Sequence, residues 1–150
     1  MSKVSPFNGR WGLNYASDFE VMMEDWGIAE EYKKKVRVAL KDFGPDRLVE
    51  EYHIDNDAGT ISRKVTYQNE SRNSQNVPFE TWKQGVYFDG RPTKSYYGRE
   101  GGRDDTIVRF EIGNNDKLHF MIMTQVVGNT MISTYSVRGK TYVKKFDRLP

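Results

Sequence analysis

The spacing of turn-forming residues is the feature that most constrains the fold of this chain. After Arg47, clusters rich in Gly, Asn and Asp recur at short intervals, and the segments between them are rich in Val, Ile, Thr, Tyr and Phe. Such segments are typical of antiparallel strands joined by tight turns. The polar run 69–76 is expected to be a loop. The predicted strands are 7–15, 47–54, 59–68, 76–83, 85–88, 92–99, 106–112, 117–126, 130–138 and 140–147.

Two helices are predicted between the first and second strands. The first covers residues 17–27, where apolar residues recur at the spacing of one helix face. The second covers residues 29–43, with an apolar side and a basic side, and Gly44-Pro45 ends it. The apolar residues of the first helix are Phe19, Met22, Met23 and Trp26. The basic side of the second carries Lys33, Lys34, Lys35, Arg37 and Lys41.

Ten sequential antiparallel strands with a helix pair after the first describe a mainly β fold. We expect an up-and-down β-barrel, or β-clam, with a helix-turn-helix lid. At 150 residues the chain is expected to form a single domain, 1–150. A ten-stranded barrel is wider than one whose side chains fill the lumen, so a cavity for a largely apolar ligand is expected.

Composition argues against several classes of function. The chain has no cysteine, which excludes disulfides and thiol catalysis, and its two histidines give no metal-ligand spacing. The formal charge of +2 is too small to indicate nucleic-acid binding. No apolar run reaches the roughly 20 residues of a membrane span, and residues 1–6 lack the apolar core of a secretory signal. We therefore expect a cytoplasmic, monomeric protein that is not an enzyme and needs no cofactor or metal.

Two stretches resemble a known family. The run D-F-E-V-M-M-E-D-W-G-I at 18–28 is similar to the first helix of the intracellular lipid-binding proteins, the fatty-acid-binding and retinoid-binding proteins of the calycin superfamily. The run F-D-G-R-P-T-K-S at 88–95 is similar to a turn of that family. The resemblance implies a ten-stranded clam with a helical cap that carries a hydrophobic ligand. It also implies ligand contacts for Phe19 and Met23 in the lid, and for Phe88, Asp89 and Arg91 at the portal turn.

The family holds carboxylate ligands with two arginines and a tyrosine, and this chain departs from that pattern. The matching positions carry Thr124, Lys144 and Phe146, and Ser133 and Tyr135 are expected to point inward beside them. Lysine is a point charge and not a fork, so this set is a weaker carboxylate clamp. A fatty acid and a neutral retinoid-type or sterol-type ligand both stay open.

The segment 106–109, T-I-V-R, resembles the family segment that carries the first arginine. Under this second register Arg109 and Glu111 would point inward; otherwise Arg109 would face solvent. The two registers differ in which side chains of this strand face the cavity and which face solvent.

The main hypothesis is a cytosolic carrier of a long-chain fatty acid or similar lipid. The basic side of the second helix would contact anionic membranes transiently, or would be an ordinary solvated face. An alternative is a cofactor-independent oxygenase or luciferase-like enzyme on the same barrel, which His53 and His119 facing one cavity would favour. Gly9-x-Trp11 suggests a secreted lipocalin-type carrier, but the early helices and missing cysteines argue against it.

Overall fold

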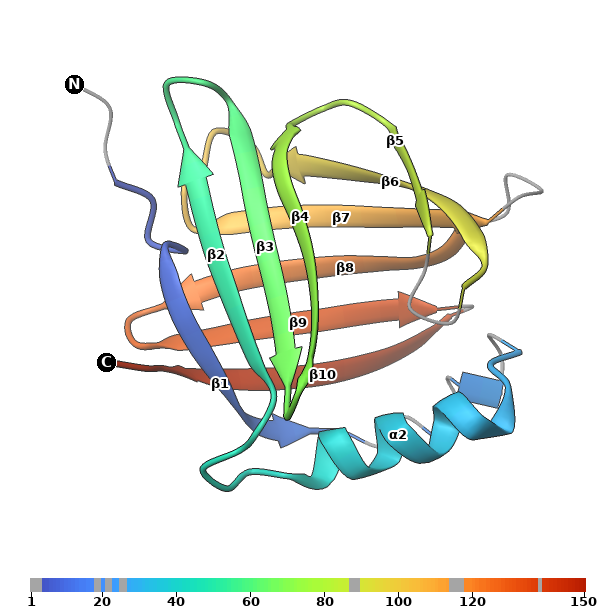
Figure 1. Ribbon diagram of the computed structural model, residues 1–150. Coiled ribbons are helices and arrows are strands. Elements are labelled where there is room, and N and C mark those ends of the chain that lie inside the picture. Colours follow the sequence, from blue (N-terminus) through green and yellow to red (C-terminus); the bar gives the residue numbers. More distant parts are fainter. Residues whose placement is uncertain are drawn as a thin grey trace.

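The computed structural model describes residues 4–17, 20, 23–24, 27–86, 90–113, 118–137 and 139–150, with the backbone alone at 118 and 119. Ten strands and a helix follow one another along the chain (Figure 1). They are β1 (Gly9–Ala16), α2 (Glu30–Lys41), β2 (Val49–Asp55), β3 (Thr60–Tyr67), β4 (Glu70–Pro78), β5 (Lys83–Val86), β6 (Pro92–Arg99), β7 (Thr106–Gly113), β8 (Leu118–Val127), β9 (Thr130–Val137) and β10 (Lys140–Arg148).

The strands form one antiparallel sheet that curls into a nearly closed barrel. Their order is β4-β3-β2-β1-β10-β9-β8-β7-β6-β5. Strands that follow one another in the sequence are therefore paired, except β4 and β5, and β1 pairs with β10. Within the described ranges no ladder joins β4 to β5. The predicted β-clam is confirmed, and its opening lies between these two strands.

The predicted loop at 69–76 is wrong, because residues 70–76 belong to β4. Tyr67 pairs with Glu70 across a tight turn, and the ladder to β3 continues to Pro78. The side chains of β4 are polar and nearly all exposed, so the strand lacks the alternation that marks a half-buried strand. Backbone pairing to β3, the buried side chain of Val77 and a hydrogen bond from Arg72 to the carbonyl of Val86 hold it in place.

Contacts of Trp11 and Arg148 anchor the first strand. Trp11 is fully buried, and its indole Nε1 donates a hydrogen bond to the carbonyl of Phe7 at 2.9 Å. The guanidinium of Arg148, at the end of β10, stacks on the Trp11 ring and donates to the carbonyl of Pro6 at 2.7 Å. The two ends of the chain are thereby tied together.

The second predicted helix is confirmed as α2, which lies across one end of the barrel (Figure 1). Ala39 and Leu40 are its buried apolar side chains. Most of the first predicted helix, Phe19 included, lies outside the described residues; Glu20, Met23 and Glu24 are helical.

The predicted basic side of the second helix is wrong at Lys33. Its side chain is buried, and its ammonium donates a hydrogen bond to Glu24 at 2.9 Å. This bond raises the pKa of Lys33 above its ordinary value, since it favours the charged form. The exposed basic residues of α2 are therefore Lys34, Lys35 and Lys41. Among the described residues, no helix has the length and apolar character that crossing a membrane requires.

Candidate functional site

A cavity of about 560 Å³ occupies the barrel interior. Its apolar wall comes from α2, from Met23 and from both halves of the sheet. The side chains that form this wall include Met23, Ile28, Leu40, Val65, Phe120 and Ile122. The volume lies within the range of about 300–1,000 Å³ that is usual for small-molecule sites.

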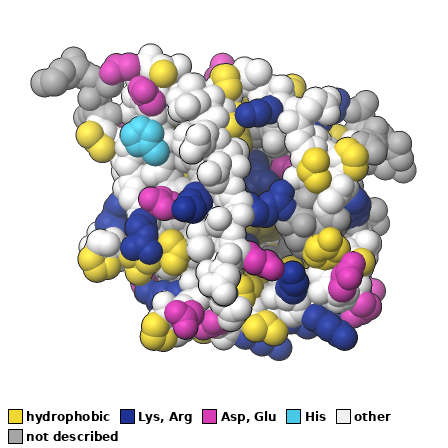
Figure 2. Space-filling view, viewed as in Figure 1, with side chains coloured by type: hydrophobic (Ala, Val, Ile, Leu, Met, Phe, Trp, Pro, Cys, Tyr) yellow, Lys and Arg dark blue, Asp and Glu magenta, His cyan; other side chains and the backbone are white. Residues whose placement is uncertain are grey.

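The cavity opens between β4 and β5. Arg72 of β4 and Lys83 of β5 line it there, and Arg72 Nη2 donates a hydrogen bond to the carbonyl of Val86 at 2.7 Å. Figure 2 shows this face hollowed between the two strands, with basic side chains around the opening. An anionic molecule would therefore meet positive charge on entry.

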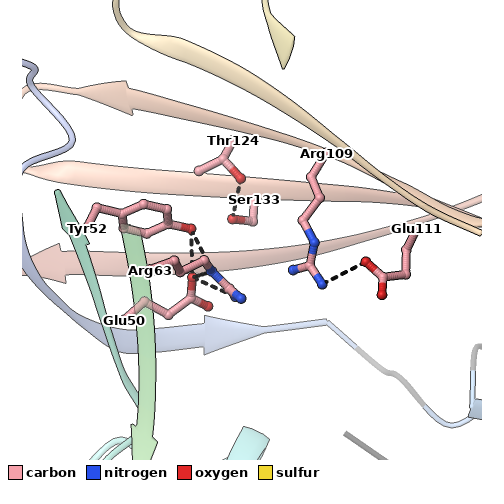
Figure 3. A network of polar contacts seen from close by, with 7 residues as sticks. All are labelled: Glu50, Tyr52, Arg63, Arg109, Glu111, Thr124 and Ser133. Atoms are coloured by element: carbon pink, nitrogen blue, oxygen red, sulfur yellow. Dashed lines mark hydrogen bonds and ion pairs between the residues drawn. The ribbon is translucent and has the colours of Figure 1, made fainter. Parts of the chain in front are cut away.

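A buried ion pair lies on the wall formed by β2 and β3 (Figure 3). Glu50 is 2% exposed and accepts hydrogen bonds from Arg63 Nη2 at 3.1 Å and from the Tyr52 hydroxyl at 2.9 Å. Arg63 Nε also donates to the Tyr52 hydroxyl at 3.2 Å. The cluster thus fixes the guanidinium of Arg63 at the cavity surface.

The charges of this cluster support one another. Burial alone would raise the pKa of the Glu50 carboxyl, but the positive charges of Arg63 and Lys144 and the bonds from Tyr52 and Arg63 bring it below its ordinary value. Burial and the adjacent Glu50 carboxylate raise the pKa of Tyr52 well above its ordinary value. Glu50 is therefore ionised and Tyr52 neutral at physiological pH.

A second ion pair lies on the opposite wall. Arg109 Nη2 of β7 donates to Glu111 at 3.1 Å, and the Thr93 hydroxyl donates to the other carboxylate oxygen at 2.7 Å. The Arg109 guanidinium lies over the rings of Tyr97 and Phe120, at 5.9 and 5.6 Å from their centroids. Its position is thus set by a fixed carboxylate and by two aromatic faces.

A small inner pocket of about 10 Å³ adjoins these pairs. Thr124 and Ser133 line it and form a hydroxyl–hydroxyl hydrogen bond of 3.0 Å. Tyr135 lines both this pocket and the main cavity, and the ammonium of Lys144 lies 4.9 Å from the Tyr135 ring centroid. Polar residues therefore lie at the inner end of the cavity as well as at its opening.

The structure brings together most of the side chains predicted for the site. Those that line the main cavity or its inner pocket are Met23, Arg109, Thr124, Ser133, Tyr135 and Lys144. Arg109 faces the interior, so the alternative of a solvent-exposed Arg109 is wrong. Phe146 is fully buried but does not line the cavity, and Arg91 is half-buried and outside the lining. Phe19, Phe88 and Asp89 lie outside the described residues.

Sequence reasoning missed Glu50, Tyr52 and Arg63. Their signal was present, because Glu50 shares a strand face with Tyr52 and Ile54, and Arg63 shares one with Ile61. A charge on the apolar face of a strand indicates either a buried pair or a ligand contact.

The described histidines and acidic residues do not form the arrangements that would indicate an enzyme or a metal site. His53 is exposed on β2 and does not face the cavity. The pair of cavity histidines that would favour an enzyme is therefore not formed. The side chain of His119 lies outside the described residues. In the described part of the chain, no three His, Asp or Glu side chains gather to hold a metal ion. The described site is an apolar chamber with charged groups at its inner end and at its opening.

No protein-family model and no curated protein sequence matches the chain. Solved structures do match it. A fatty acid binding protein of Schistosoma mansoni in complex with arachidonic acid superposes with a TM-score of 0.82 at 17% identity, covering 99% of this chain and 100% of that one. Fatty-acid-binding protein 1 of Echinococcus granulosus gives 0.78 at 17% identity, covering 96% and 98% of the two chains.

Two further matches show the range of the fold. A fatty-acid-binding protein from brain tissue of Drosophila melanogaster has a TM-score of 0.74 at 17% identity, covering 94% of this chain and 98% of that one. As-p18, described as an extracellular fatty acid binding protein, has 0.76 at 11% identity, covering 98% and 100%. The expected resemblance is confirmed at the level of architecture: this chain has the fold of the fatty-acid-binding proteins.

Proposed function

We propose that the protein is a carrier that binds a long-chain fatty acid, or a similar lipid with an acidic head group, inside its barrel. The observation that carries this proposal is an apolar cavity of about 560 Å³ with an excess of positive charge. Burying the apolar tail would contribute about 25 cal/mol per Å² removed from water. No reaction is required, and we further propose that the carrier is a monomer in the cytoplasm.

Charge favours an acid over a neutral retinoid-type or sterol-type ligand. Arg63, Arg72, Lys83, Arg109 and Lys144 line the main cavity, against a single lining glutamate, Glu111. An interior of this kind lowers the free energy of a bound anion relative to the matching alcohol. We expect Thr124, Ser133, Tyr135 and Lys144, which line the inner end of the cavity, to lie near the head group.

The test is a titration of delipidated protein with a fluorescent fatty acid, followed by displacement with palmitic acid and with hexadecanol. Native mass spectrometry of protein purified from cells would identify what it carries. We expect saturable uptake, and displacement by the acid at a lower concentration than by the alcohol. A protein that takes up neither molecule would refute the proposal.

A matched pair of variants on α2 ties uptake to the cavity. Leu40→Glu places a charge on the cavity wall, whereas Val38→Glu places the same charge on the outer side of the same helix, where Val38 is 59% exposed. Uptake should fall strongly in the first variant and stay near the wild-type level in the second. Circular dichroism would establish that both are folded.

A further inference from the structure

We propose that the ligand carboxylate binds between the guanidinium groups of Arg63 and Arg109, which are supplied by β3 and β7. This inference rests on the proposed carrier function and assigns its head-group site. The positions matching the family's clamp lie on β8 and β10, where this chain has Thr124, Lys144 and Phe146. The site would therefore lie on different strands from the one that the resemblance implies.

The first argument is position. Arg63 and Arg109 line both the main cavity and the inner pocket, so they lie where the two meet. Figure 3 shows their guanidinium groups directed into the interior from opposite walls. Tyr97 and Tyr135 line the same junction. An inner pocket of about 10 Å³ accepts at most one water-sized group, so an aliphatic tail stays in the main cavity. A head group that meets both arginines lies at the junction.

The second argument is preorganisation. Arg63 is held by Glu50 through Nε and Nη2, and a guanidinium carries five N–H donors, more than this carboxylate accepts. Arg109 is held by Glu111, which Thr93 fixes in turn. Neither arginine has to be ordered when the ligand arrives, which removes an entropic cost of binding.

The third argument is the charge balance. The inner end of the cavity holds three cations, Arg63, Arg109 and Lys144, and two anions, Glu50 and Glu111. These side chains carry one more positive than negative charge. A bound carboxylate makes the two signs equal in number, whereas an alcohol or an ester leaves the balance unchanged.

Charge-conserving pairs of substitutions test the assignment. A single change at either arginine would leave a buried glutamate without its cation, so we choose Glu50→Gln with Arg63→Gln, and Arg109→Gln with Glu111→Gln. The control is Arg103→Gln with Asp105→Asn, an exposed pair whose members are two residues apart, as Arg109 and Glu111 are. Palmitic acid and hexadecanol are titrated into each delipidated protein.

We expect each cavity pair to weaken palmitic acid binding by about tenfold or more, because charge-assisted hydrogen bonds are lost, with hexadecanol changed by less than about twofold. The control pair should change neither. If the wild type binds neither molecule, the carrier function itself fails. If it binds the acid and both cavity pairs bind it equally well, or if only Lys144→Met abolishes the preference for the acid, the assignment to the arginines is overturned.

A measurement on the unaltered protein covers the case in which a variant does not fold. Palmitic acid labelled with ¹³C at its carboxyl carbon is bound and titrated by NMR. Between two guanidinium groups the bound carboxyl should stay ionised to a lower pH than the free acid, because both charges favour the carboxylate. A carboxyl that titrates like the free acid would contradict the inference.

Discussion

Replacing Arg63 with methionine should destabilise the protein by about 3–5 kcal/mol at neutral pH, the usual cost of removing one partner of a buried ion pair. The carboxylate of Glu50 is 2% exposed and would lose bonds of 3.1 and 3.3 Å. The bond from Tyr52 and the charge of Lys144 remain, so we expect the lower part of this range. Domains of this size have free energies of unfolding of about 5–15 kcal/mol, so the variant should fold with a reduced margin.

The loss should depend on pH with a definite sign. In the wild type the pKa of Glu50 lies below its ordinary value of 4.5, so its contribution is complete above that pH and is lost as the pH falls through the folded-state pKa. Without Arg63, burial dominates and raises the folded-state pKa above 4.5. The folded variant then takes up a proton before the unfolded chain does. Its deficit relative to the wild type should therefore shrink as the pH falls from about 7 toward 5.

Urea unfolding at several pH values, followed by circular dichroism, measures both effects. The pair Glu50→Gln with Arg63→Gln is the control, and it should lose less than Arg63→Met because no unpaired charge remains. A loss below about 1 kcal/mol at neutral pH, the scale of an exposed pair, would refute the reasoning. So would a loss of the same size at pH 7 and at pH 5.

Three further predictions concern a buried side chain outside the cavity, the cavity opening and the exposed charges of α2. Phe146→Ala should cost about 3–5 kcal/mol in urea unfolding and leave palmitic acid affinity within about twofold, because Phe146 is fully buried outside the cavity lining; a selective loss of affinity would contradict this. Arg72→Ala should speed ligand entry and release in stopped-flow measurements with little change in Kd, because it removes the bond to Val86 across the opening; unchanged rates would count against entry there. Lys34→Glu with Lys41→Glu should slow transfer to anionic vesicles and not to zwitterionic ones, because the exposed charges of α2 would attract anionic lipid; equal slowing would contradict a role in membrane contact.

The sequence predicted most of the fold because turn residues separate the strands and because some strands, such as β2 and β9, alternate between buried and less buried residues. Along β9, Met131, Ser133, Tyr135 and Val137 are buried and alternate with less buried residues, and the register to β10 pairs Ser133 with Lys144. The resemblance of the last strand to the family's clamp set this register, and alternation then placed Ser133 and Tyr135 inward. β4 was missed because its polar side chains carry no such period.

The pair Glu50–Arg63 was within reach of the same reasoning, but it needed one more step. The turn at 55–59 fixes the register of β2 and β3, which sets Glu50 opposite Val65 and Arg63 opposite Tyr52. Two residues diagonal to each other on one face of a hairpin lie close enough for long side chains to meet. Opposite charges at such positions on an apolar face predict a buried pair from register alone. The family resemblance does not point to Arg63 of β3, because the family's clamp lies on the last strands. It did point to Arg109 of β7, through the likeness of segment 106–109.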